Sequence, residues 1–430
     1  MMRNWNIKNK KLIPLLLVFS CILKSCIEPV MIETENFEDL LVIEALLTTE
    51  NKIHQIRLSR SFTFEDSAAV KESGATITIQ DNENRMFSFE ETTDGVYEST
   101  EAFSPSTNNE YQLRVTTSAN RSYSSDFVKP TQPFALENVF AERIINDNDA
   151  FGLGIFVDSE NSPEQNVYLK YEFDETYKLV APFWAGVTTI PSSNESGFEV
   201  VPKENPNDRI CYRTESLKDI LLTNTENQSI NTIKRFQVHF INVTNHRLRT
   251  RYSINVKQIN QTRETYRFFE LLGKLSDLDN IFSQLQPGFV EGNLISESDP
   301  DEKVIGYFSI SSVSEKRIFI NFDDFFPDEK TPNYIRDCNV DDLTPDLPSL
   351  RQAIEDASPL DRGTIIASIR QSLESQIPVL LRSENLRFFT IGDLSFENTI
   401  VKSNIPIFTP EECGDCRIFG SNIKPDFWVD

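Results

Sequence analysis

The sequence predicts a mainly β protein, with an N-terminal immunoglobulin-like or transthyretin-like β-sandwich followed by a larger β-rich domain with short helical insertions. Short apolar runs alternate with polar residues at a period of two, and clusters of Asn, Asp, Gly and Ser separate these runs. Only two long segments change to the helical period. Phenylalanine is abundant at 32 residues and glycine is scarce at 14, so the chain can fill sizeable cores.

The first domain is predicted for residues 39–130. Residues 75–80 alternate most clearly between polar and apolar side chains, and a polar turn follows at residues 81–84. A length of about 90 residues suits one sandwich. Two prolines within residues 129–133 then make a stiff linker. The other strands predicted in this domain are residues 41–47, 54–59, 86–89, 111–116 and 123–128.

The second domain is predicted for residues 134–430. Residues 233–243 and 248–256 have the strongest hairpin pattern in the chain, with a turn between them at Asn245 and His246. A second hairpin-like pair is predicted over residues 304–322, with its two arms at 304–313 and 316–322. Further strands are expected at residues 151–157, 167–173 and 386–391.

Helical insertions are predicted near residues 262–285 and 349–374. In the first of these, apolar side chains return every three or four positions, and a break is expected near Ser276. In the second, Pro359 and Gly363 interrupt the helical pattern. The break near Ser276 is expected to divide the first insertion into two short helices that pack on a sheet.

Residues 1–25 are predicted to be a lipoprotein signal peptide. Residues 12–23 form an apolar core of about a dozen residues, which suits a signal sequence and is too short to span a bilayer. Ser25 then places a small residue directly before Cys26. This pattern lets the cell attach a diacylglyceryl group to the thiol of Cys26 and cleave before it. Cys26 is therefore the expected lipidation site, and residues 26–38 are the expected tether.

Other interpretations of this segment are an ordinary secretory signal and an N-terminal membrane helix. A second cysteine, Cys21, also follows a serine, but cleavage there would leave the apolar core short. After the signal, no segment reaches about 18 uninterrupted apolar residues. The lipid on Cys26 is therefore the expected attachment to the membrane.

The charge of the chain excludes one class of function. The formal net charge is −24, and the signal peptide holds five basic residues and no acidic one, so the mature chain is more acidic still. Such a surface repels the phosphates of nucleic acids, and we expect no nucleic-acid partner. It suits solubility beside a membrane, or a basic partner.

Four cysteines beyond the anchor predict two disulfides, with three connectivities open. They are Cys211, Cys338, Cys413 and Cys416. Cys413 and Cys416 form a CxxC, which is also found in redox pairs and in halves of zinc sites. The three histidines lie far away in sequence, and no second CxxC is present, so we expect no metal. Structural disulfides are favoured, with the tail fixed to the region of Cys338.

No known catalytic motif is present. The sequence holds no G-x-S-x-G, no phosphate-binding loop and no H-E-x-x-H, and we expect no cofactor. Paired carboxylates are plentiful, and two of them across a cleft could hydrolyse glycans. Phe183 and Trp184 lie in a predicted loop, where aromatic side chains could contact a ligand or partner or pack onto their own core.

Several short motifs along the chain resemble one protein family. Together they are similar to the Bacteroidota outer-membrane lipoproteins that contain domain of unknown function 4249, and the resemblance covers nearly the whole mature chain. The motifs are Cys-Ile-Glu-Pro at 26–29, the strands at 41–47 and 56–60, Asp-Pro-Asp-Glu at 299–302, Gly-Tyr-Phe-Ser at 306–309, Glu-Lys-Arg at 315–317, Cys-Gly-Asp-Cys-Arg at 413–417 and Lys-Pro-Asp-Phe-Trp at 424–428.

The resemblance implies a location and a class of partner, but no activity. It implies lipid anchoring at the outer membrane, on either the periplasmic or the cell-surface face. Such proteins are often encoded beside TonB-dependent receptors, which implies an accessory role at a transporter. The leading hypothesis is therefore a non-enzymatic binding protein. The alternatives are a surface hydrolase that uses carboxylates of the second domain, and a structural or adhesive surface module.

Overall fold

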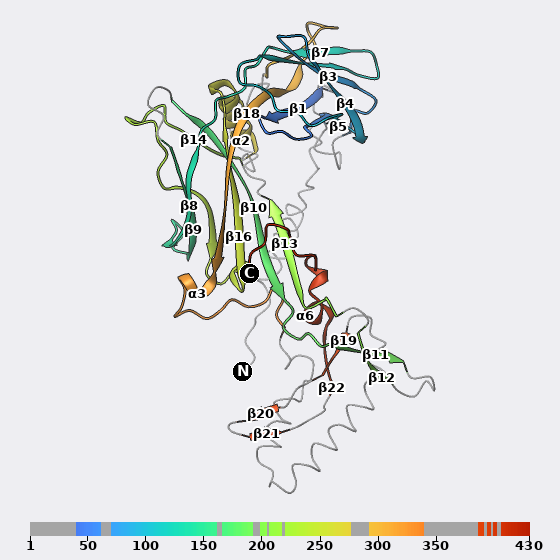
Figure 1. Cartoon of the computed structure of the whole chain (residues 1–430), viewed down its shortest axis with the longest axis vertical. Coiled ribbons are helices and arrows are strands. Elements are labelled where there is room, and N and C mark those ends of the chain that lie inside the picture. The colour runs from blue at the N-terminus through green and yellow to red at the C-terminus, as the bar shows by residue number, and fades with distance from the viewer. Residues whose placement is uncertain are drawn as a thin grey trace, which may run out of the picture.

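The computed structural model describes most of the chain after the predicted tether (Figure 1). It describes residues 40–61, 70–160, 166–191, 198–203, 206–216, 220–276, 292–338, 386–390, 394–396, 399–401 and 406–430. The fold is mainly β with a few short helices, which confirms the predicted fold class. None of the helices in these ranges is long and apolar enough to cross a membrane.

The N-terminal strands form one curved sheet around a single core. Apolar side chains on alternate positions of the first strand, such as Ile43 and Leu47, point into this core. The strands follow the order β1, β2, β5, β4, β3, β6, β7, β17. Their bounds are β1 (Leu41–Thr48), β2 (Gln55–Arg60), β3 (Thr76–Asp81), β4 (Met86–Thr93), β5 (Val96–Ser99), β6 (Tyr111–Thr116), β7 (Ser122–Ser125) and β17 (Leu294–Ser296).

The core of this sheet takes side chains from two distant parts of the sequence. Leu294, Val304, Phe308 and Ile310 pack with the residues of β1 to β7. The side chain of Asn293 donates to the carbonyl of Phe308 at 2.8 Å and accepts from its amide at 2.8 Å. These bonds bring β17 next to β18 (Val304–Asn321). Residues 39–130 therefore do not form the first core alone.

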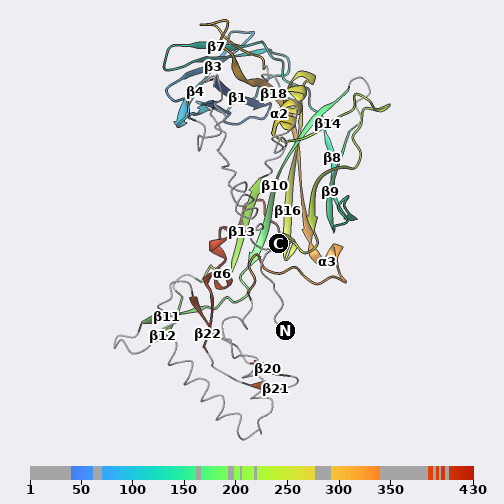
Figure 2. The same cartoon turned by 180° about the vertical axis from the view of Figure 1, so that it is seen from behind.

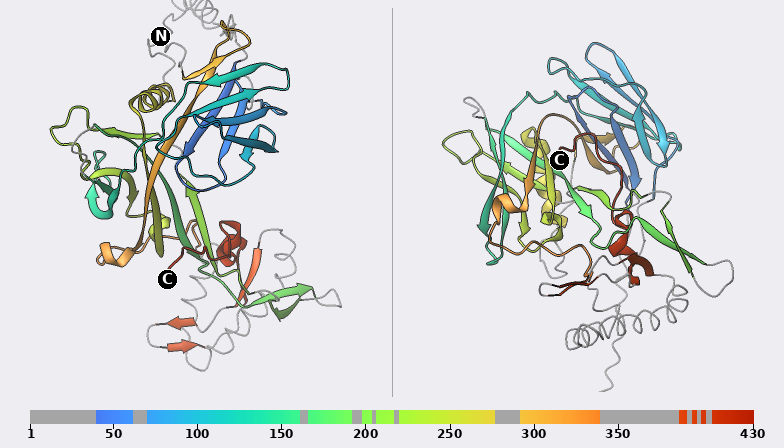
Figure 3. Two further views of the ribbon diagram at one scale, coloured as in Figure 1. Left: turned by 45° about the horizontal axis from the view of Figure 1, so that its top comes forward. Right: turned by 60° about the horizontal axis from the view of Figure 1, so that its bottom comes forward.

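Strand β18 runs through both halves of the molecule (Figure 3, left). Its first eight residues pair in parallel with β1, from Leu41 opposite Val304 to Thr48 opposite Ser311. Its remaining residues pair antiparallel with β16 (Arg251–Asn260). The predicted hairpin over residues 304–322 is therefore wrong, because this segment is one continuous strand of 18 residues.

Two serines in the middle of β18 bind the linker. The amide of Ser312 donates to Thr131 Oγ1 at 2.7 Å, and its hydroxyl donates to the carbonyl of Gln132 at 2.6 Å. Ser314 Oγ accepts from the amide of Leu136. Thr131 Oγ1 also donates to the carbonyl of Asn260 on β16 at 2.8 Å. The linker is thus hydrogen-bonded to both long strands where β18 changes partner.

The second half is a sandwich of two sheets (Figures 1 and 2). The large sheet continues in the order β18, β16, β10, β13, and a three-stranded sheet of β15, β9 and β8 packs against it. Inward side chains such as Tyr171, Ile155 and Ile254 fill the space between them. The remaining bounds are β8 (Leu136–Ile145), β9 (Phe151–Ser159), β10 (Tyr168–Val180), β13 (Ile210–Ser216), β14 (Leu221–Asn224) and β15 (Phe236–Asn242).

The predicted hairpin of residues 233–243 and 248–256 is wrong. Both segments are strands, but β15 pairs with β9, whereas β16 pairs with β10 and β18. A single 3-10 turn, η1 (His246–Leu248), carries the chain from one sheet to the other. Side-chain alternation reports which face of a strand is buried, and here both strands face the same core from opposite sides.

One predicted helix is found, and the other lies outside the described residues. Helix α2 (Arg263–Ser276) packs Phe268 and Phe269 against Leu222 and Tyr307, which confirms the first part of the helix predicted near 262–285. Residues 277–291 and the helix predicted near 349–374 are not described. The remaining elements are β11 (Val187–Pro191), β12 (Phe198–Pro202), β19 (Leu386–Thr390), β20 (Leu394–Phe396), β21 (Thr399–Val401), β22 (Pro406–Pro410), α3 (Phe322–Phe325), α6 (Glu411–Gly414) and η3 (Cys416–Ile418).

Candidate functional site

The four cysteines form two disulfides that fix the C-terminal segment. Cys211 on β13 bonds to Cys416, and Cys338 bonds to Cys413, with Cα atoms 5.6 and 5.8 Å apart. This confirms two structural disulfides and the attachment of the tail to the Cys338 region. Each cysteine of the CxxC is bonded to a distant partner, so in this structure the motif is not a redox pair.

The aromatic pair predicted as a contact site lies beside these disulfides. The amide of Phe183 donates to the carbonyl of Cys413 at 3.0 Å. Trp184 is partly buried against the second core, and its indole N–H donates to Asp208 at 2.5 Å. Lys203 donates to the other oxygen of this buried carboxylate at 2.6 Å. These contacts support the interpretation that the loop packs onto its own core.

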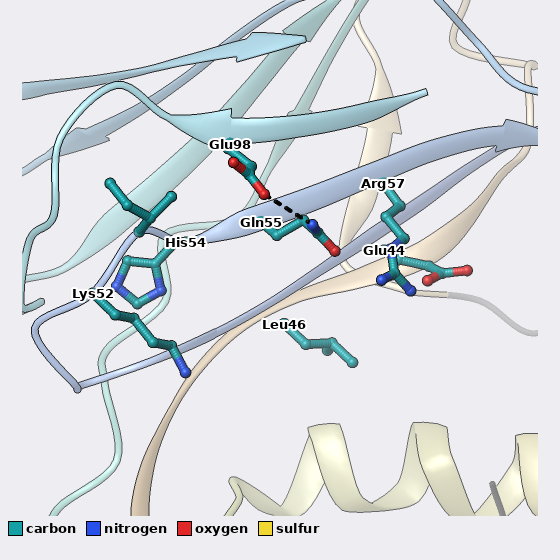
Figure 4. Close-up of a pocket in the computed structure, with 8 residues that line it drawn as sticks. Glu44, Leu46, Lys52, His54, Gln55, Arg57 and Glu98 are labelled. Carbon is teal, nitrogen blue, oxygen red and sulfur yellow. Dashed lines mark hydrogen bonds between the residues drawn. The ribbon is translucent and has the colours of Figure 1, made fainter. Parts of the chain in front are cut away.

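An open groove lies on the outer face of the N-terminal sheet, over β1, β2 and β5 (Figure 4). Its volume is about 580 Å³, within the usual range for sites that bind small ligands. In Figure 4, Lys52 and His54 lie at one end, Glu44 and Arg57 at the other, and Leu46 and Gln55 between them. The groove therefore combines apolar surface with charges of both signs.

Strand geometry explains why these side chains line the groove. Successive residues of a strand point to opposite faces, so Ile43 and Ala45 enter the core while Glu44 and Leu46 face outward. Glu44 lies opposite Arg57 in the antiparallel pair of β1 and β2. Leu46 and Ile53, which also lines the groove, keep 42% and 46% of their surfaces exposed and supply its apolar surface.

His54 forms the buried end of the groove. Its Nε2 atom lies 3.0 Å from the carbonyl of Phe103 and donates a hydrogen bond to it. Burial lowers the pKa of His54, and the charge of Lys52 adds to this effect. The ring is therefore neutral and held in place at neutral pH. It supplies a fixed wall to the groove.

A second cluster of polar groups lies between the sheets of the second half. Arg247 donates to Glu175 at 2.9 Å and forms a very short ion pair with Glu215. The hydroxyl of Tyr252 donates to Glu175 at 2.9 Å. His239 Nε2 lies 3.5 Å from the same carboxylate. The cluster thus connects strands of the large sheet with β15 of the three-stranded sheet, and Arg247 of η1 is its cation.

The electrostatics of this cluster keep Glu175 ionised. Burial alone would raise the pKa of Glu175, but the contact with His239 and the charge of Arg247 outweigh it, so the pKa lies below its usual value. A general acid for glycoside hydrolysis needs a raised pKa. Glu175 has the opposite shift, and Arg247 binds both it and Glu215. This arrangement fits a structural ion cluster rather than a hydrolytic pair.

The sequence pattern contained a signal for this cluster that the prediction did not use. Glu175 occupies the inward position that follows Leu169, Tyr171 and Phe173 on β10. A carboxylate in that position of an apolar face requires a buried partner. Nothing in the sequence identified Arg247 as that partner, because it lies on the turn between two sheets. Within the described ranges, no group of three or more potential ligands could hold a metal ion.

We expect the protein to lose stability below about pH 6.5, the ordinary pKa of histidine. Burial lowers the pKa values of both His54 and His246, and the charge of Arg247 also lowers that of His246. The unfolded chain then binds protons that the folded chain does not, so the free energy of unfolding falls as pH decreases. Glu175 adds a further loss at lower pH, since its folded pKa is also lowered.

Urea denaturation at pH 7.5 and 5.5 measures this loss. The variant His246→Gln should reduce the difference between the two pH values. Equal stability at both values in the unaltered protein would show that neither histidine is held neutral by the fold.

Comparison with known proteins identifies a family but no function. The sequence model described as "Domain of unknown function (DUF4249)" matches residues 27–317. No curated protein matches the sequence. Among solved structures, a DUF4785 family protein from Legionella pneumophila matches with 9% identity and a TM-score of 0.18. That match covers 51% of this chain and 52% of the other, and so spans about half of its length.

Proposed function

Because the chain belongs to the family defined by domain of unknown function 4249, we propose that it is a lipid-anchored accessory protein of the Bacteroidota outer membrane. In this proposal it binds a ligand or a protein partner and acts beside a TonB-dependent receptor. The anchor is the thioether at Cys26, and no catalytic step is assigned to the chain.

The observation that carries the proposal is the groove on β1, β2 and β5. Two of its lining residues, Glu44 and Leu46, belong to β1, the first strand after the proposed tether. Leu41 lies fifteen positions after Cys26, and a fully extended chain spans at most about 3.5 Å per residue. The start of β1 can therefore lie no more than about 50 Å from the lipid anchor. A partner embedded in the same membrane is within reach of this face.

The rigid connection between the two halves also supports a binding role. The groove lies on a sheet whose central strand β1 pairs with β18, and β18 continues into the second sandwich. Hydrogen bonds from Thr131 fix the linker at the junction. A rigid frame of this kind holds a binding surface in one shape, which lowers the entropy cost of association.

The hydrolase alternative receives no support from the described carboxylates of the second half. Glu175 and Glu215 both form ion pairs with Arg247, and they do not line the groove. The identity of the bound partner distinguishes a structural or adhesive role from the proposed accessory role. An adhesive module would engage surfaces outside the membrane rather than a receptor within it.

We expect charge placed in the groove to abolish partner binding. The double variant Leu46→Glu and Ile53→Glu places two carboxylates on its apolar surface and should reduce recovery of the partner about tenfold or more. The matched control is Ile145→Glu, at a side chain that is 67% exposed on β8. The tagged full-length chain would be isolated from detergent-solubilised membranes, and co-purified receptors quantified by mass spectrometry.

The proposal would be overturned if the unaltered chain recovered no TonB-dependent receptor and no other outer-membrane protein. If the groove variant and the control recovered equal amounts of the partner, the partner would be confirmed, but its contact would lie elsewhere on the chain.

A further inference from the structure

The C-terminal residues lie across the outer face of the large sheet (Figure 1). We call residues 417–430 the C-terminal strap. The disulfide of Cys416 with Cys211 fixes its start, and Ser421 pairs with Tyr212 through two backbone hydrogen bonds of 2.8 and 2.9 Å. From α6 the strap runs across the edge strand β13 toward β16, as Figure 1 shows in red. The motif Lys-Pro-Asp-Phe-Trp forms its last part.

The end of the strap is held by one buried side chain. Trp428 is buried and meets the rings of Tyr212 and Phe319 edge-on, with centroids 5.0 and 5.6 Å apart. The neighbouring Phe427 and Val429 remain 39% and 59% exposed. Apart from Trp428, the strap beyond Ser421 contributes little buried apolar surface.

The polar contacts of the strap lie at the surface. Asp430 pairs with Lys178 at 3.0 Å and with Lys424 at 2.7 Å, and more than half of the Asp430 side chain is exposed. Exposed ion pairs of this kind contribute about 0–1 kcal/mol each. The strap is therefore fixed covalently at its base, whereas its end is held by the burial of Trp428 and by exposed polar contacts.

The face beneath the strap carries two arginines, Arg251 and Arg317, for which no ion pair within 4 Å is found among the described residues, although the charges of Asp174 and Glu315 act on Arg317. Arg251 Nε donates to the carbonyl of Val429 at 2.6 Å, and its guanidinium stacks 5.0 Å from the ring of Phe319. The guanidinium of Arg317 lies 3.6 Å from the ring of Phe427 and donates to Ser253 Oγ at 3.1 Å. Partial burial lowers the pKa of Arg317.

Arg251 and Arg317 place two positive charges on this face of a protein whose net charge is −24. Guanidinium groups bind carboxylates through strong, often bidentate hydrogen bonds. The strap offers Arg251 a carbonyl and offers Arg317 an aromatic ring. A segment with carboxylates at these two positions would complement the face better than the strap does.

We propose that this face is the docking site for an extended segment of a partner protein that carries an aromatic residue flanked by carboxylates. Residues 423–430 occupy the site until that segment displaces them. The proposal does not depend on the lipid anchor or on a receptor. It assigns a role to the C-terminal motif that the groove does not explain.

Because the disulfide of Cys416 holds the strap next to its site, the strap competes strongly with any other segment that binds there. A segment linked to its own site acts at an effective concentration in the millimolar range, so a free peptide binds poorly while the strap is in place. Weakening the strap should therefore reveal the site. The opened variant is Phe427→Ala with Trp428→Ala. The control is Ile423→Ala, at a strap residue that is 75% exposed and should leave the strap closed.

The test uses the full chain and a fluorescent peptide that copies residues 421–430 with Val429→Glu. By fluorescence anisotropy, this peptide should bind the opened variant at least about tenfold more tightly than the unaltered chain or the control. Adding Arg251→Gln or Arg317→Gln to the opened variant should weaken binding about tenfold, since each removes a charge-assisted hydrogen bond. Failure of the peptide to bind the opened variant, or binding that is independent of both arginines, would overturn the proposal.

Hydrogen exchange on the unaltered chain provides a second measurement. The amide of Trp428, which donates to the carbonyl of Pro425, should exchange at least about 100-fold faster than the amides of β16. Protection of Trp428 equal to that of β16 would show that the strap opens only on global unfolding, and would overturn its displacement. If the opened variant no longer unfolds cooperatively, the strap is part of the folded core, and this result would also overturn its displacement.

Discussion

Replacing Gly306 with alanine should destabilise the protein by about 3 kcal/mol or more. Gly306 has a φ of +138°, which side-chain-bearing residues rarely adopt. A Cβ atom there would lie 2.0 Å from the carbonyl oxygen of Ile43. Ile43 is the partner of Gly306 in the parallel pair of β1 and β18, so neither backbone can move without disrupting the ladder.

The matched control is Gly273→Ala within helix α2. No atom lies within 4 Å of a Cβ at Gly273, and alanine favours a helix interior over glycine by about 1 kcal/mol. Urea denaturation followed by circular dichroism measures both changes. Stability of Gly306→Ala within about 0.5 kcal/mol of the unaltered chain would show that β1 and β18 do not pair as described.

Replacing Arg247 with methionine should cost about 3–5 kcal/mol, because it leaves the buried Glu175 without its cation. Methionine keeps much of the side-chain volume, so the loss measures charge rather than packing. Adding Glu175→Gln to this variant should restore part of the lost stability, since the amide carries no charge to desolvate. The two changes would be compared in a double-mutant cycle by urea denaturation.

The matched control for Arg247 is Lys274→Met at the surface of α2. Lys274 pairs with Glu270 at 3.6 Å, and 68% of its side chain is exposed. Its loss should change the free energy of unfolding by less than about 0.5 kcal/mol. A similar small effect at Arg247 would contradict a buried ion cluster.

The strands could be predicted from the sequence because burial of one face imposes alternation. In the first sheet β1 and β3 follow this rule closely, and the predicted ranges match the observed ones to within a few residues. Strand β5, with four residues, is too short to show a period and was missed. The two disulfides were expected because four cysteines in a chain predicted to be exported favour pairing.

The pairing of strands could not be predicted from the sequence, because alternation identifies a buried face and not a neighbour. β15 and β16 follow each other closely in the chain, yet they belong to different sheets. Ser312 and Ser314 lie inside one continuous strand, where they form hydrogen bonds to linker residues that are distant in sequence. The groove and the Arg247 cluster depend on the same long-range pairings, so neither could be located in advance.

Intact-mass and peptide analysis of the membrane-bound protein tests the central proposal most directly. The account predicts a mature chain that begins at Cys26 and carries a diacylglyceryl thioether, with residues 1–25 absent. A mature chain with an unmodified thiol at position 26, or a first residue elsewhere, would contradict it.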